Sequence, residues 1–202
     1  MGFFSTSSSI TRYKIVGEVD ERLWENIPDL LKKFSFQDID EVVDELSFGW
    51  VCFDNMLDNM WNTSSPYKGE YVVFSLRIDK RKISPAVFKK YYQLALKEIA
   101  DEDKDLKFLP KNKKQEIKEN LRLRLLQKTL PVPSVTDVIW DFKKGYVYLF
   151  TTNKSTKEIF QDLFIRSFNL GLVQITPYEL GKIYEKELEI NIDKYKPQIF
   201  AI

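Results

Sequence analysis

Two strand-like runs separated by only three residues constrain the fold of this chain more than any other feature of its sequence. Residues 135–142 and 146–152 are rich in β-branched and aromatic side chains, and residues 143–145 (Lys-Lys-Gly) lie between them. A connection this short joins antiparallel strands, because parallel strands need a crossover of about a dozen residues or more. Gly145 supplies the backbone freedom that a tight turn requires. The sequence therefore predicts a β-hairpin here, within an antiparallel sheet.

The other expected elements keep helices and strands in separate blocks. Apolar and β-branched runs predict further strands at 13–17, 47–53, 71–78 and 172–176. Helical spacing predicts helices at 21–33, from Pro85 to about 101, at about 112–128, at 155–168 and from Pro177 onward. Residues 62–68 are expected to form a loop. This order predicts an α+β fold: a mainly antiparallel sheet with a long charged helical hairpin and flanking helices.

Single residues allow more detailed predictions about these elements. Asp20 and Ser155 are expected to be N-caps, and Pro28 is expected to kink or break the first helix. Side chains alternate between the two faces of a strand. The residues of the hairpin expected to share one face are Val138, Trp140 and Phe142.

The chain is expected to form one main domain. Residues 13–178 make up the α+β domain, with an N-terminal segment at 1–12 and a C-terminal helix and tail at 179–202. Within the domain, residues 80–128 should form two helices that pack as a hairpin beside the sheet. The residues expected to face inward, at helical spacing, are Phe88, Tyr92, Ile99, Leu121 and Leu125.

The chain has no histidine and a single cysteine, Cys52. This composition excludes Ser-His-Asp and Cys-His catalysis, zinc bound by histidines or by several thiolates, and an intramolecular disulfide. A single cysteine suits a reducing compartment, so a cytoplasmic location is expected. The longest apolar runs are far shorter than the roughly 18 residues of a membrane span, so no membrane partner is expected.

The net charge of +1 hides a strong asymmetry along the chain. Residues 1–70 carry six Lys and Arg against thirteen Asp and Glu, whereas residues 80–128 carry fifteen Lys and Arg against seven Asp and Glu. A basic segment of this kind points to a polyanionic partner. The alternative is an ordinary pair of solvated helices.

The basic segment contains the candidate DNA-binding residues. Cations on regular elements suit phosphate contact without base reading. The candidates are Lys80, Arg81, Lys82, Lys90, Lys97, Lys111, Lys114, Lys118 and Arg122. Tyr91, Tyr92 and Phe108 lie among them, either as stacking platforms for bases or, as the more common alternative, as core residues.

The carboxylates offer weaker candidates for metal chemistry. Asp101, Asp103 and Asp105 have the spacing of the first ligands of a calcium loop, but the glycine and closing glutamate of that loop are missing, which favours a solvated helix end. Asp137 and Asp141 lie on one strand face about 13 Å apart, at roughly 3.3 Å per residue. Two short side chains at that separation do not share a metal ion. The sequence therefore predicts no catalytic residue, no metal site and no cofactor.

Several short motifs, in this order, resemble the recombination-associated RdgC protein family. They are Phe48-Gly49-Trp50-Val51, Ile83-Ser84-Pro85-Ala86-Val87, a long charged helix pair ending in Leu130-Pro131, Trp140-Asp141, Gly145-Tyr146-Val147, and a helix and strand that end at Pro177. The resemblance covers roughly residues 34–178.

The resemblance implies a function as well as a fold. It implies a cytoplasmic, nucleoid-associated protein that binds duplex DNA without sequence preference, forms a homodimer and modulates recombination or recombinase filament formation, without being an enzyme. Two alternatives stay open: an interaction or scaffold module of this fold that has lost DNA binding, and a metal-dependent nuclease that uses Asp137 and Asp141.

Overall fold

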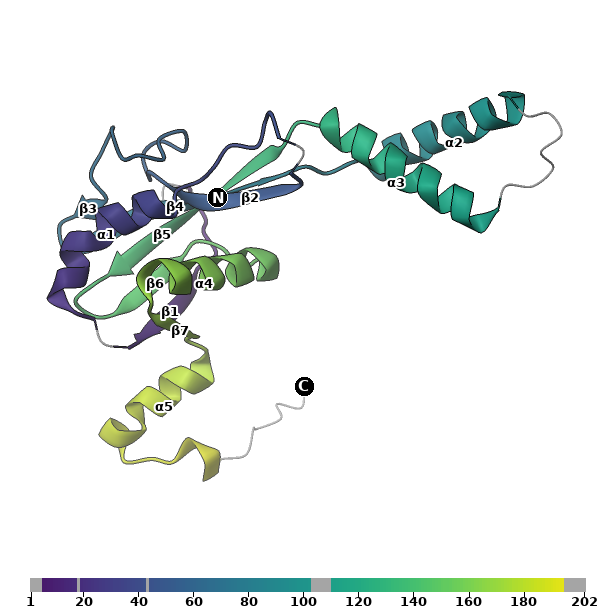
Figure 1. The fold of residues 1–202 in the computed structure, drawn as a ribbon. Helices are drawn as coiled ribbons and strands as arrows, with labels where there is room; N and C mark the ends of the chain where they lie inside the picture. Colours follow the sequence, from purple (N-terminus) through teal and green to yellow (C-terminus); the bar gives the residue numbers. More distant parts are fainter. Residues whose placement is uncertain (1–4, 18, 43, 103–109, 195–202) are drawn as a thin grey trace.

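The computed structural model describes residues 5–17, 19–42, 44–102 and 110–194 (Figure 1). The strands are β1 (Thr11–Val16), β2 (Leu46–Val51), β3 (Tyr67–Lys68), β4 (Tyr71–Lys80), β5 (Val132–Asp141), β6 (Tyr146–Leu149) and β7 (Gly171–Gln174). The helices are α1 (Glu21–Lys33), α2 (Pro85–Glu102), α3 (Lys111–Gln127), α4 (Lys154–Phe168), α5 (Pro177–Leu188) and the short 3-10 helix η1 (Ile192–Lys194). Among the helices in these ranges, none is long and apolar enough to cross a membrane.

The strands form one antiparallel sheet in the order β2-β4-β5-β6-β1-β7, with β3 beside β4. The predicted hairpin is β5–β6, in which Val138 pairs with Leu149 and Asp141 with Tyr146. Gly145 closes the turn with a φ of 65°, in the left-handed region that favours glycine. Separate helices and an antiparallel sheet confirm the predicted α+β class.

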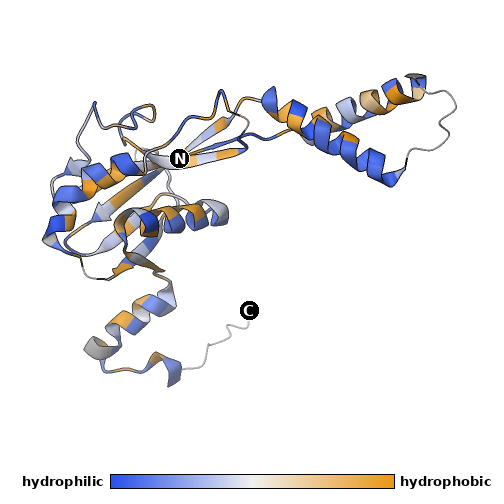
Figure 2. Ribbon diagram, in the orientation of Figure 1, coloured by the Kyte–Doolittle hydropathy of each residue, from blue (hydrophilic) through white to orange (hydrophobic). Residues whose placement is uncertain are grey.

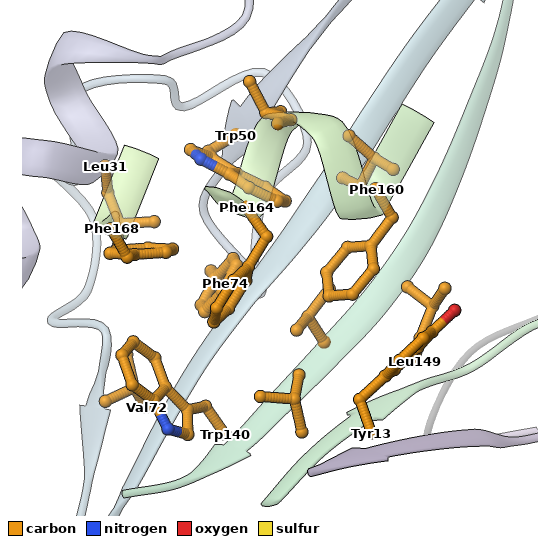
Figure 3. Packing of buried hydrophobic residues seen from close by; sticks show 14 of the residues in the cluster. Tyr13, Leu31, Trp50, Val72, Phe74, Trp140, Leu149, Phe160, Phe164 and Phe168 are labelled. Atoms are coloured by element: carbon orange, nitrogen blue, oxygen red, sulfur yellow. The ribbon is translucent and has the colours of Figure 1, made fainter. Parts of the chain in front are cut away.

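The core lies between one face of the sheet and helices α1 and α4 (Figures 1 and 3). Val138 and Trp140 are fully buried on this face, and Phe142 packs against Trp140 with the ring centroids 5.2 Å apart. These contacts confirm that the three residues share one face. The rings of Trp50 and Phe74 meet edge to face at 5.0 Å, which joins β2 to β4 (Figure 3).

The helix ends follow local hydrogen bonding. The Asp20 side chain accepts from the N–H of Arg22 and caps α1 as expected, and the helix continues through Pro28 without a break. The prediction for Ser155 is wrong. Asn153 caps α4 instead, because its Oδ1 accepts from the N–H of Thr156 at 3.1 Å, and Asn is as good an N-cap as Ser.

Two strand boundaries differ from the sequence prediction. β5 begins at Val132 and includes Pro133, which lies opposite Asp79 of β4. Proline is tolerated there because β6 reaches only as far as Val138, so Pro133 borders a strand on one side only. The other difference is β3, whose two residues lie within the predicted loop at 62–68 and pair with β4.

The helices α2 and α3 form the predicted hairpin, called the arm below, but the prediction that it packs beside the sheet is wrong. The arm projects beyond the ends of β2, β4 and β5, away from the body (Figure 1). Leu121 and Leu125 are buried as predicted, while Phe88, Tyr92 and Ile99 are only half-buried. The two helices bury one side of each other, and the end of α3 also meets the body, where Arg81 donates to the carbonyls of Leu126 and Thr129.

The predicted domain boundaries fall close to element ends. The boundary after residue 12 lies inside β1, which starts at Thr11, and the boundary after residue 178 lies inside α5, which starts at Pro177. The helix α5 contacts η1, and the Nζ of Lys182 lies 2.6 Å from a carboxylate oxygen of Asp193.

Replacing Asp58 with Asn is expected to destabilise the protein at pH 7 and to have little effect near pH 2. Burial raises the pKa of Asp58, but hydrogen bonds from Thr63, Asn62 and Met60 outweigh it and lower the pKa to about 2. The usual pKa of an aspartate is about 3.9. The folded value lies below the unfolded value, so this stabilisation is complete above about pH 4 and lost as the pH falls toward 2. Urea midpoints at both pH values test this, with Asp29→Asn as the exposed control. An equal loss at both pH values contradicts it.

Candidate nucleic-acid interface

Most of the predicted DNA-binding cations are exposed on the arm or at its base. Seven of the nine lie at the surface, Lys114 is half-buried and Arg81 is buried. The seven are Lys80, Lys82, Lys90, Lys97, Lys111, Lys118 and Arg122. Figure 2 shows α3 as the most continuously hydrophilic element of the arm. The structure therefore presents most of the basic segment to solvent on a projecting element.

The first turn of α3 contains lysines and no acidic residue. Lys111, Lys113 and Lys114 lie where the helix macrodipole is positive, and the N-cap residue Pro110 makes no side-chain hydrogen bond to the turn. Positive charge at a helix N-terminus is unfavourable by a few tenths of a kcal/mol to about 1 kcal/mol per residue. A bound anion would offset this repulsion, so the arrangement suits an anionic partner better than it suits the helix alone.

The base of the arm contains a cleft of about 530 Å³ that brings distant cations together. Lys80 ends β4, Lys82 follows it, and Arg122 reaches the cleft from α3. The guanidinium of Arg122 lies 3.0 and 3.1 Å from the two carboxylate oxygens of Glu45, in a solvent-exposed ion pair. Exposed pairs contribute at most about 1 kcal/mol, so a phosphate can replace Glu45 at little cost.

Arg81 differs from the other candidates, because it lines the cleft but its side chain is buried, which argues against it as a DNA contact. The residue is 4% exposed. Its guanidinium donates to the backbone carbonyls of Ile39 (2.6 Å), Asp40 (3.0 Å), Val42 (3.0 Å), Asp44 (3.2 Å), Leu126 (3.4 Å) and Thr129. Arg81 thus connects the segment before β2 to the end of α3. A run of three cations in a sequence does not reveal that the middle one points inward.

The aromatic residues among the arm cations divide between the two expected roles. Tyr92 is half-buried, stacks on Phe88 at 6.3 Å between ring centroids, and has the Nζ of Lys118 5.4 Å from its ring, so it belongs to the contact between α2 and α3. Tyr91 is 43% exposed and presents its ring to solvent. Phe108 lies outside the described residues.

Two of the candidate carboxylates, Asp137 and Asp141, lie on β5 and away from the arm cations. Asp137 accepts a hydrogen bond from Ser75 at 2.9 Å, and Asp141 accepts from the N–H of Lys144 at 3.0 Å. Asp101 is exposed near the end of α2, whereas residues 103 and 105 lie outside the described residues. In the described ranges, no three His, Cys, Asp or Glu side chains gather closely enough to hold a metal ion.

The sequence prediction missed the second charged surface, on the sheet face opposite α1 and α4. Arg12, Lys14, Lys68 and Lys144 lie there among aromatic side chains, from three separate segments of the chain. Arg12 and Lys14 have alternation as their sequence signal, because they lie out of phase with the core residues Tyr13 and Ile15 of β1. Lys68 and Lys144 lie in a two-residue strand and a turn, where no such signal exists.

Comparison with known proteins identifies no relative of this chain. No protein-family model matches the chain, and no curated protein matches it. The resemblance to the RdgC family therefore depends on the motifs themselves.

Proposed function

We propose that this protein binds duplex DNA without sequence preference through the arm and the cleft at its base. The observation that carries the proposal is the set of seven exposed cations, two at the base of the arm and five on its projecting helices. Lysine and arginine on such an element contact phosphates rather than base edges, which gives affinity without specificity. The resemblance to the RdgC family supports a role in modulating recombination or recombinase filaments at the nucleoid.

The proposal includes a homodimer that forms through the arm. Val87, Tyr91 and Leu94 are each more than 40% exposed and lie on one face of α2. A second copy of the chain that covers this face would bury them. Sedimentation velocity is expected to show a dimer at micromolar concentration and a monomer for Leu94→Glu, whereas a wild-type monomer contradicts this part of the proposal.

The affinity for duplex DNA is expected to fall steeply with salt. If about six phosphates are neutralised, the logarithm of the association constant should fall against the logarithm of salt concentration with a slope of about −5. Fluorescence anisotropy with labelled duplexes of two unrelated sequences measures this. Equal affinities for both sequences are expected. Absence of binding at low salt favours the scaffold alternative.

Charge reversal on the arm provides the matched test. The variant Lys90→Glu/Lys97→Glu/Lys111→Glu should bind duplex DNA at least about 100-fold more weakly, because three phosphate contacts become repulsive. The control variant Lys32→Glu/Lys33→Glu/Lys154→Glu makes the same change in net charge at exposed lysines on α1 and α4. Equal losses in both variants would show that net charge alone, and not the arm, sets the affinity.

The proposed function does not include catalysis, and the absence of nuclease activity can be tested separately. Linear duplex DNA incubated with the protein and Mg²⁺ or Mn²⁺ is expected to stay intact. Cleavage products that disappear in an Asp141→Asn variant would favour the nuclease alternative, since a nuclease needs carboxylates around a divalent ion.

A further inference from the structure

The sheet face opposite α1 and α4 contains a pocket of about 690 Å³, a volume typical of small-molecule and nucleotide sites. Its floor consists of Val73, Ile139 and Tyr148, which lie side by side because Val73 pairs with Ile139 and Ile139 with Tyr148 across β4, β5 and β6. Phe150 and Tyr71 line the same pocket. The floor is thus apolar and contains aromatic rings in the middle of a sheet.

Cations border this floor on two sides. Lys68 of β3 and Lys144 of the β5–β6 turn line the pocket itself. On the neighbouring strand β1, Arg12 lies opposite Tyr148 and Lys14 opposite Tyr146, on the same face. The Nζ of Lys14 lies 4.2 Å from the ring centroid of Tyr146 and donates to the Lys144 carbonyl at 2.8 Å. Four cations from three elements therefore border one aromatic surface.

Two carboxylates complete the pocket. Asp141 is 5% exposed, accepts from the Lys144 N–H at 3.0 Å, and has the Lys144 ammonium 3.7 Å away. Asp54 is more exposed and pairs with Lys68 at 3.2 Å. A carboxylate has about four acceptor positions, so both retain capacity for a donor from a ligand. Both lysines have exposed side chains, and Lys68 can turn toward a ligand anion without leaving a buried charge, because Asp54 is itself exposed. If Lys144 turns, Asp141 keeps the hydrogen bond from the Lys144 N–H.

We propose that this pocket binds an unpaired nucleotide of a single-stranded nucleic acid. The base would lie on the apolar floor against Tyr148, with its amino or imino groups facing Asp141, and the phosphates would follow the border of Lys68, Lys144, Arg12 and Lys14. Single strands are bound in this way, by stacking on aromatic side chains of a sheet and by cations along the backbone. A duplex keeps its bases stacked and offers none to the floor. The inference depends on this face alone and not on the arm.

Nuclear magnetic resonance with a decathymidylate at low salt locates the site. Backbone amide shifts are expected at Ile139, Lys144 and Tyr148, and on β1. Shifts confined to α2 and α3, or no shifts at all, overturn the proposal. Because arm and sheet give separate signals, failure of this site and failure of the duplex-binding proposal are distinguishable.

Anisotropy with the same labelled oligonucleotide tests the stacking contact. Tyr148→Ala is expected to weaken binding about 5- to 100-fold, because the ring on which the base stacks is lost. Tyr148→Phe keeps the ring and should bind within about twofold of wild type. Tyr184→Ala removes an exposed tyrosine of α5 and should have no effect.

A charge variant tests the same pocket independently, in case Tyr148→Ala does not fold. Lys68→Glu/Lys144→Glu changes two exposed side chains and should lower the affinity for the oligonucleotide at least about tenfold. The arm variant Lys90→Glu/Lys97→Glu/Lys111→Glu should leave the amide shifts on the sheet face unchanged. Wild-type affinity in both Tyr148→Ala and the Lys68/Lys144 variant overturns the proposal, and so does a pocket that binds an apolar peptide but no oligonucleotide.

Discussion

Replacing Arg81 with Ala should lower the free energy of unfolding by about 3–5 kcal/mol. The guanidinium donates to six backbone carbonyls, contributed by the segment at 39–44 and by Leu126 and Thr129 at the end of α3. Alanine removes the donor from the part-buried carbonyls of Asp40, Val42, Asp44 and Thr129, whereas the carbonyls of Ile39 and Leu126 still accept from the N–H groups of Val42 and Thr129. Each unsatisfied buried group costs about 1–3 kcal/mol, less where the chain relaxes or water enters.

Urea denaturation followed by circular dichroism measures this loss. Arg81→Lys should recover only part of it, since an ammonium has three donors on a single nitrogen and does not reproduce the fork of the guanidinium. Lys82→Ala is the matched control, because the neighbouring side chain is exposed and its loss should change stability by less than about 0.5 kcal/mol. If Arg81→Ala behaves like Lys82→Ala, the carbonyl cluster does not stabilise the fold.

Replacing Gly49 with Ala should destabilise the protein by about 3 kcal/mol or more. A Cβ atom at Gly49 would lie 2.4 Å from both the Cα and the N of Phe36, which are backbone atoms that cannot rotate away. The backbone around Phe36 is held in place by hydrogen bonds to both sides of Trp50, from Phe36 N to Trp50 O and from Trp50 N to Phe34 O. Relief of the clash therefore requires these bonds to break or β2 to shift.

Gly69→Ala separates this clash from the general cost of replacing glycine. Gly69 has a φ of 65° and no atom near its Cβ position, so its replacement should cost only the roughly 1–2 kcal/mol of a left-handed backbone. Thermal and urea denaturation of the two variants give the comparison. A smaller effect at Gly49 than at Gly69 would show that the chain at 34–36 moves easily.

The strands and helices were largely predictable because each has a strong local signal. Trp140 and its neighbours alternate, Phe88 and Tyr92 repeat at helical spacing, and Gly145 permits the turn. The direction of the arm was not predictable, because it depends on where β4 and β5 stop pairing. The ladder ends at the pair formed by Lys80 and Val132. No pattern within either strand marks this pair, because it depends on how the two strands are aligned.

The candidate site was predictable in composition but not in detail. Charge density marked the arm, yet it could not separate the exposed Lys82 from the buried Arg81, since that difference depends on carbonyls from chain segments some 40 residues earlier and 45 residues later. The sheet face was missed for a similar reason. Tyr148 and Arg12 become neighbours only through the pairing of β1 with β6.

The attachment of the arm to two adjacent strands determines how the molecule responds to mechanical force. β4 leads into the arm and β5 follows it, so both connections lie at the same end of the β4–β5 ladder. At that end Lys80 pairs with Val132, and at the far end Tyr71 pairs with Asp141. A pull along the arm therefore draws β4 and β5 in one direction and does not slide them past each other. The force acts instead as shear on the outer ladders, β2–β4 and β5–β6, where several hydrogen bonds must fail together. In the proposed complex, tension transmitted through DNA bound to the arm would thus act on the sheet in its most resistant direction.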